Sequence, residues 1–85
     1  MKMYHFNPND HGAEYFVMEE NKTKAHECLI KHLENKIIKH PLIAESIKTD
    51  LDIWKQVNPS DSKSFPSKYT LDEHEVSSVI ESEIA

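Results

Sequence analysis

The residues of this chain with the most obvious chemistry are six histidines and a single cysteine. Two metal ligands on one helix need a spacing of three or four residues to reach the same ion. His26 lies six residues before His32, and His40 lies eight residues after it, so neither pair has that spacing. We therefore predict no metal and no cofactor. The alternative left open is a metal site drawn from separate elements, formed by His5, His11 and His74.

The cysteine and the serines offer no better case for catalysis. Cys28 flanks the apolar stripe of a predicted helix, so we expect a small buried residue, whereas a reactive thiolate needs exposure and nearby positive charge. The only glycine, Gly12, cannot build a Gly-x-Ser-x-Gly nucleophile elbow or a glycine-rich phosphate loop. Acidic neighbours such as Glu19 and Glu20 diverge on a strand. We predict that the protein is not an enzyme.

Acidic and aromatic side chains are the remaining signals, and they favour binding to another protein. Beyond Lys68 the chain has five acidic residues and no basic one. This segment either solubilises the protein or presents a negative surface to a basic partner. Trp54 is either a core residue, which its place on an apolar helix face favours, or an exposed anchor for a partner. The candidate partner-binding residues are Asp72, Glu73, Glu75, Glu81, Glu83, Trp54 and Tyr15.

The charge of the chain is uneven. All ten basic residues are lysines, and the net charge is −5. Arginine is the usual residue for bidentate contacts to phosphate and guanine, so its absence disfavours direct binding to nucleic acid. Residues 1–20 carry a net charge of −3, residues 21–57 carry +2, and residues 58–85 carry −4. The two ends are acidic and the middle is mildly basic.

Length and composition suit one globular domain over residues 1–85, with 38% hydrophobic and 29% charged residues. No apolar run approaches the roughly 18 residues that a membrane-spanning helix needs. The N-terminal residues lack a hydrophobic signal core. A single cysteine excludes an internal disulfide and fits a reducing compartment. We expect a cytoplasmic protein that binds no membrane.

The element pattern predicts an α+β fold in the order β-β-α-α-β. Residues 4–6 and 14–18 are strand-like runs around turn-forming residues, where Gly12 is expected to have a positive φ. The second run has apolar residues on both faces. It is therefore predicted to be internal to the sheet or covered by a partner, and a homodimer is slightly favoured over a monomer.

Two helices and a third strand follow. Residues 22–39 repeat an apolar residue every four positions after an N-cap at Asn21, and residues 41–57 continue as a second helix with a break allowed near residue 49. A third strand is predicted near residues 68–75, and residues 76–84 fit either its extension or a helical face. The predicted core consists of Leu29, Leu33, Ile37, Ile47, Leu51 and Phe16.

The N-terminal third of the chain resembles the start of a known group of small proteins. Tyr4-x-Phe6, then residues 14–17, then residues 20–25 entering a helix, resemble the hairpin-then-helix start of small acidic phage-encoded accessory proteins. That group includes anti-CRISPR and other anti-defence inhibitors. The resemblance implies a non-enzymatic inhibitor, in the host cytoplasm, that occludes a bacterial defence or nucleic-acid-handling protein. The alternative is a homo-oligomer that binds a small ligand such as a nucleotide between subunits.

Overall fold

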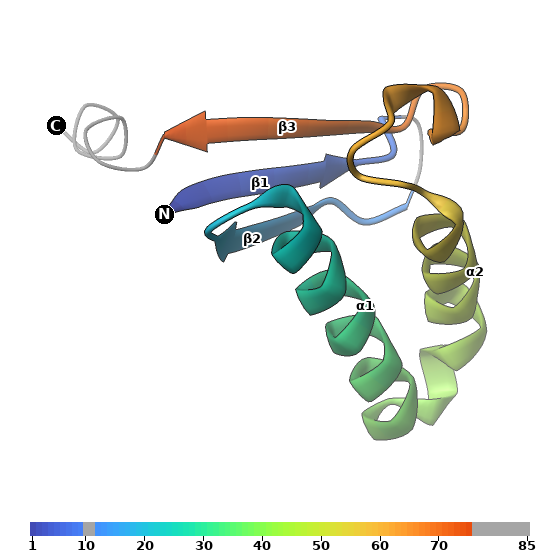
Figure 1. Cartoon of the computed structure of the whole chain (residues 1–85). Coiled ribbons are helices and arrows are strands. Elements are labelled where there is room, and N and C mark those ends of the chain that lie inside the picture. The colour runs from blue at the N-terminus through green and yellow to red at the C-terminus, as the bar shows by residue number, and fades with distance from the viewer. Residues whose placement is uncertain (10–11, 76–85) are drawn as a thin grey trace, which may run out of the picture.

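The computed structural model describes residues 1–9 and 12–75, and it shows a three-stranded antiparallel sheet with two helices packed on one of its faces (Figure 1). The elements follow the predicted order β-β-α-α-β, so the predicted α+β fold is confirmed. They are β1 Lys2–Asn7, β2 Tyr15–Glu19, α1 Lys22–Lys39, a 3₁₀ turn Pro41–Ile43, α2 Ala44–Gln56, a 3₁₀ turn Ser62–Ser64 and β3 Thr70–Glu75. Residues 76–84, for which two conformations were considered, lie outside the described residues.

The sheet has the order β2-β1-β3, so β1 is the central strand and β2 lies at an edge. Among the strands of the described residues, this order excludes an internal position for the second strand, which was one of its two predicted alternatives. His5 in the middle of β1 is paired with Phe16 on one side and with Asp72 on the other. Since side chains alternate between the faces of a sheet, this register assigns every strand residue to a face.

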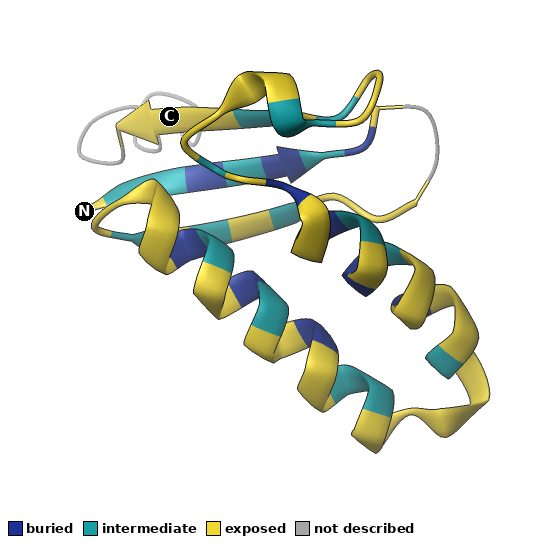
Figure 2. Ribbon diagram, turned by 45° about the vertical axis from the view of Figure 1, so that its right-hand side comes forward, coloured by how far each residue is buried: buried dark blue, intermediate teal, exposed yellow. Residues whose placement is uncertain are grey.

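The core lies between the inner face of the sheet and the helices (Figure 2). Tyr4 and Phe6 of β1 point into it, and the Phe6 ring meets Trp54 of α2 edge-on at a centroid distance of 5.3 Å. Four of the predicted core residues are buried (Leu29, Leu33, Ile47 and Leu51), and Ile37 is partly buried against them. The prediction for Phe16 is wrong: its side chain points to the opposite face and is 59% exposed.

Local signals explain where the helices begin and end. The Asn21 side chain accepts a hydrogen bond from the Lys24 amide at 2.9 Å, which caps α1 as predicted. Pro41 follows α1 and opens the short 3₁₀ turn that leads into α2. Helix α2 runs through residue 49 without the break that was allowed there. The Thr49 hydroxyl donates to the carbonyl of Glu45 at 3.1 Å within the helix, so it is not used as a new cap.

Two further contacts hold the elements in place. The His26 ring lies 2.6 Å from the Trp54 carbonyl through Nε2, which links α1 to the last turn of α2. Gly12 has φ +95°, as predicted for the loop between the first two strands. In the same loop Asn9 has φ 66°, and its side-chain amide donates to the Lys68 carbonyl and to the Thr70 hydroxyl. The hairpin loop is thereby tied to the start of β3.

Candidate protein-binding surface

The face of the sheet that points away from the helices is covered by no described element (Figures 1 and 2). We call it the outer sheet face. It carries large apolar side chains on the edge strand, where Phe16 is 59% and Met18 is 46% exposed. The strand register places the following residues on it: Met3, His5 and Asn7 of β1, Phe16 and Met18 of β2, and Thr70, Asp72 and His74 of β3.

His5 lies at the centre of the outer sheet face. The His5 ring stacks on the Phe16 ring with a centroid distance of 4.3 Å and an interplanar angle of 9°. Its Nε2 lies 3.4 Å from Glu14 Oε1, which forms an ion pair when the ring is protonated. The stack fixes the orientation of Phe16, so this exposed ring is preorganised and loses little freedom when it is covered.

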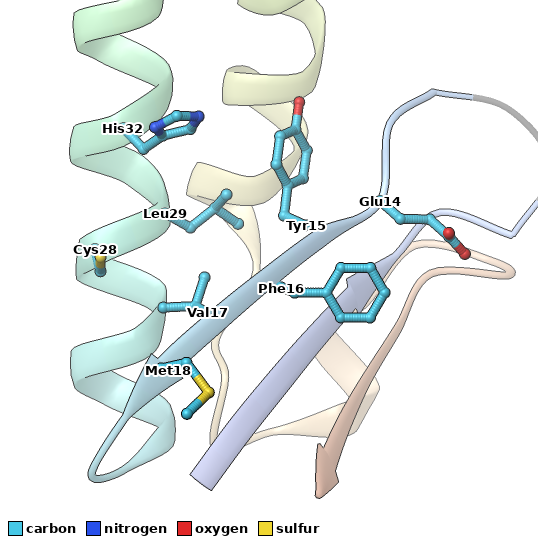
Figure 3. Close-up of a pocket in the computed structure, with 8 residues that line it drawn as sticks. All are labelled: Glu14, Tyr15, Phe16, Val17, Met18, Cys28, Leu29 and His32. Carbon is cyan, nitrogen blue, oxygen red and sulfur yellow. The ribbon is translucent and has the colours of Figure 1, made fainter. Parts of the chain in front are cut away.

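A groove of about 410 Å³ separates the edge strand β2 from helix α1 (Figure 3). The strand and the helix meet at residues 20–21 and diverge from there, and Val17 and Leu29 lie between them (Figure 3). The groove is lined by Glu14, Tyr15, Phe16, Val17, Met18, Cys28, Leu29 and His32. It adjoins the exposed side of β2, so the outer sheet face and the groove share this strand.

Tyr15 is the one predicted partner-binding residue that lines the groove. Its hydroxyl donates to Asp50 Oδ2 at 3.0 Å, and its ring meets the His32 ring edge-on at a centroid distance of 6.4 Å. Burial, with a smaller contribution from the Asp50 charge, raises the pKa of Tyr15 well above its usual value. The hydroxyl is therefore hydrogen-bonded to α2 and is not free to contact a partner, whereas the ring supplies apolar surface to the groove.

Cys28 also lines the groove, and the prediction that it is buried is wrong. The thiol belongs to an exposed residue, whereas its neighbour Leu29 is 1% exposed. Successive helical residues are about 100° apart, so a residue that flanks the buried stripe falls at its margin. Here that margin is the side of α1 beyond the edge of β2 (Figure 3).

The predicted acidic residues divide between the two faces of β3. Asp72 lies on the outer sheet face, whereas Glu73 and Glu75 share the other face, as alternation predicts. Glu73 accepts a hydrogen bond from the Tyr4 hydroxyl at 3.1 Å and lies 3.4 Å from Lys2 Nζ, which is also 3.7 Å from Glu75. These contacts, the Tyr4 bond first, lower the pKa of Glu73. Glu81 and Glu83 lie outside the described residues.

Lys2 also shapes the charge of β3, and the sequence alone did not indicate this. A lone lysine near the start of the chain forms no pattern, and only the pairing of β1 with β3 places it beside two carboxylates. As a result, Glu73 and Glu75 are partly neutralised within the molecule. Asp72 and Glu14 are the acidic residues on or beside the outer sheet face.

Trp54 has no role as an exposed anchor. It is 1% exposed, and its ring packs edge-on against Phe6 and against Tyr69, the latter at a centroid distance of 5.2 Å. The alternative interpretation as a core residue is correct. Phe65, which lies near it in sequence, is partly buried against the same core.

Two lysines and two histidines lie close together away from the sheet, at the end of α1. A hollow of about 270 Å³ there is lined by His32, Asn35, Lys36, Lys39 and His40. The carbonyl groups that end a helix carry a partial negative charge and oppose an anion at this position. Next to it is a small apolar patch, which we call the helical tip, and which consists of Ile38, Leu42 and Ile43, exposed by 77%, 99% and 50%.

No three histidine, cysteine or acidic side chains gather as a metal site within residues 1–9 and 12–75. His5 and His74 share the outer sheet face, and His11 lies outside the described residues. No helix in the described part of the chain is long and apolar enough to cross a membrane. Comparison with protein families, curated proteins and solved structures finds no match for the chain.

Proposed function

We propose that this protein is a non-enzymatic binding module that engages a partner protein through the outer sheet face and the edge of β2. The observation that carries the proposal is the exposure of Phe16 and Met18 on an edge strand, while the helices cover only the other face. Large apolar and aromatic side chains that are exposed and fixed in place are typical of interface centres. This interpretation retains the second of the two sequence-based alternatives for β2, a strand covered by a partner.

The charge favours a partner with a basic surface. The chain has a net charge of −5, and Asp72 and Glu14 lie on or beside the apolar surface. Opposite charges around an interface steer the encounter and mainly raise the association rate. The acidic residues therefore act at long range, and Phe16 and Met18 act on contact.

Within this class we infer an inhibitor that occludes a bacterial defence or nucleic-acid-handling protein in the host cytoplasm. Two features support this role. The first is the resemblance of the N-terminal third to small acidic phage-encoded accessory proteins. The second is the negative charge, because proteins that bind nucleic acid have basic surfaces that an acidic protein can cover.

The alternative, a homo-oligomer that binds a nucleotide between its subunits, has weaker support. It requires lysine and histidine side chains that converge across a symmetric interface. In the described part of the chain such side chains converge at the end of α1, where the helix carbonyls oppose a phosphate.

The proposal is tested by capture of the partner from bacterial lysates on the immobilised protein. We expect the double variant Phe16→Ser, Met18→Ser to reduce binding of the captured partner by roughly tenfold or more, as loss of central apolar contacts does. The matched control is Ile38→Ser, Leu42→Ser at the helical tip, which removes apolar side chains that are even more exposed. If the control variant loses the partner and the sheet variant retains it, the proposed surface is wrong.

A further inference from the structure

We infer that the partner supplies an extended segment that pairs with β2 as a fourth strand and fills the groove beside α1. The segment is apolar on both faces and carries a lysine or arginine near its ends. This inference rests on the proposed function and specifies how the partner is recognised. The support comes from the two edges of the sheet, the groove, the charges near the ends of β2 and the arrangement of the helices.

The two edges of the sheet differ in their readiness to pair. An edge strand leaves the backbone groups of alternate residues unpaired, and proteins discourage further pairing with charges, prolines or bulges. Edge strand β3 has three acidic residues among its six. Edge strand β2 reads Tyr-Phe-Val-Met-Glu, with no lysine or proline and an uninterrupted register against β1. Of the two sheet edges in the described part of the chain, β2 is therefore the more apolar and the less protected.

The groove has the position that a fourth strand requires. It runs between β2 and α1, with Val17 and Leu29 on its walls (Figure 3). An added strand would send alternate side chains to opposite faces. Those that point inward would meet Val17, Leu29 and Cys28, and those that point outward would lie beside Phe16 and Met18. Both sets of neighbours are mainly apolar, which is why the segment is expected to be apolar on both faces.

Acidic side chains lie near both ends of β2. Glu14 precedes the strand, Glu19 is its last residue, and Glu20 follows it. The side chains of Glu14 and Glu20 are 51% and 67% exposed, although they contact His5 and Lys24 respectively. Basic residues near the ends of the incoming segment would complement these charges, in agreement with the basic partner of the proposed function.

The same features argue against a second copy of this chain as the occupant. The two helices extend well past β2 on the side away from β3 (Figures 1 and 2). A copy paired antiparallel to β2, through a two-fold axis perpendicular to the sheet at that edge, would direct its own helices into that space. If Val17 paired with its counterpart, Glu14 would lie opposite Glu20 of the other copy. Two negative charges in this position repel each other and disfavour the pairing. A single extended segment avoids both conflicts.

The probe for this inference is a display library of random nonapeptides, selected on the immobilised full chain. Enriched peptides are expected to have apolar residues in succession and a lysine or arginine near an end. In the best synthetic peptide, N-methylation of every second amide should weaken binding at least tenfold. N-methylation of the intervening amides should have less than a threefold effect, because an added strand uses only alternate amides toward its neighbour.

The matched variants are Met18→Lys on the edge strand and Leu42→Lys at the helical tip. We expect the first to weaken peptide binding at least tenfold and the second to leave it unchanged. The absence of an enriched peptide, or equal effects of both N-methylation patterns, would overturn the fourth strand. Protection of β2 amides that rises with the concentration of the free protein would overturn it in favour of a second copy. The proposed function fails separately, if Phe16→Ser, Met18→Ser leaves capture of the partner unchanged.

Discussion

Among single residues, Tyr4 and Lys2 show how the fold assigns different tasks to the acidic side chains of one strand. The Tyr4 hydroxyl donates to Glu73, and Lys2 lies near both Glu73 and Glu75. These contacts bind two of the predicted partner-binding acids to the protein itself. Asp72 faces the other way, onto the outer sheet face. A partner that approaches this face would meet Asp72 before Glu73. The Glu73 carboxylate contacts Tyr4 and Lys2, so its charge mainly stabilises the fold.

Replacing Tyr4 with phenylalanine tests this assignment. The hydrogen bond from Tyr4 is the main cause of the lowered Glu73 pKa, so Tyr4→Phe should raise that pKa toward its ordinary value of 4.5. A carboxylate with a lowered pKa contributes stability above its unfolded pKa and loses it as the pH falls through the folded pKa. The variant should therefore show a weaker loss of stability with acid. Side-chain carboxyl NMR shifts, followed during an acid titration, measure the Glu73 pKa directly.

The control for this titration is Tyr69→Phe, which removes a hydroxyl that forms no hydrogen bond with Glu73. It should leave the Glu73 pKa at the parent value. An unchanged Glu73 pKa in Tyr4→Phe would show that Lys2, and not Tyr4, holds the carboxylate in its ionised form.

At the scale of elements, helix α1 joins the sheet to α2 and contributes to both the core and the groove. Its buried stripe consists of Ala25, Leu29 and Leu33, and the last of these is 0% exposed. Cys28 belongs to the neighbouring stripe that borders β2. The helix thus stabilises the domain with one face and lines the candidate binding groove with the next.

Truncation of one residue from each stripe separates these roles. Leu33→Ala should lower the free energy of unfolding by about 2–5 kcal/mol, the usual cost of a large-to-small change in a core. Cys28→Ala should change it by no more than about 0.5 kcal/mol, since the residue is exposed. Denaturant unfolding followed by the fluorescence of the buried Trp54 measures both values. Equal stability of Leu33→Ala and the parent would show that the inner face of α1 is assigned incorrectly.

The period of the apolar residues explains how much of the fold could be predicted from the sequence. The four-residue repeat in α1 and α2 identifies Leu29, Leu33, Ile47 and Leu51 as core residues, because only one helix face can meet the sheet. In β2 the same reasoning fails. Apolar residues occupy both of its faces, so alternation cannot decide whether Phe16 or Val17 points inward. The position of the helices decides it.

The candidate site was harder to predict than the core, because it depends on contacts between distant segments. Alternation correctly separates Asp72 from Glu73 and Glu75. The edge position of β2 follows from the pairing of β3 with the other side of β1, and no local pattern reports that order. The groove depends in turn on the divergence of α1 from β2.

On the scale of the whole molecule, the acidic residues of the sheet lie apart from the two lysines at the end of α1, although Lys2 and Lys24 also lie near the sheet. The acidic residues Glu14, Asp72, Glu73 and Glu75 are on or near the sheet, whereas Lys36 and Lys39 lie at the end of α1, where the helices extend past β2. We expect Asp72 and Glu14 to attract the proposed basic partner to the outer sheet face, where Phe16 and Met18 would contact it. The helical tip is also apolar, but Lys36 and Lys39 near it do not favour a basic partner.

Amide hydrogen exchange on the complex with the captured partner tests the central claim most directly, namely that the partner covers β2 and the outer sheet face. Binding should slow exchange in residues 15–19 at least tenfold and leave residues 38–43 of the helical tip unchanged, because only groups covered by the partner or newly hydrogen-bonded to it gain protection. A complex that protects residues 38–43 and leaves residues 15–19 at the rate of the free protein would contradict the account.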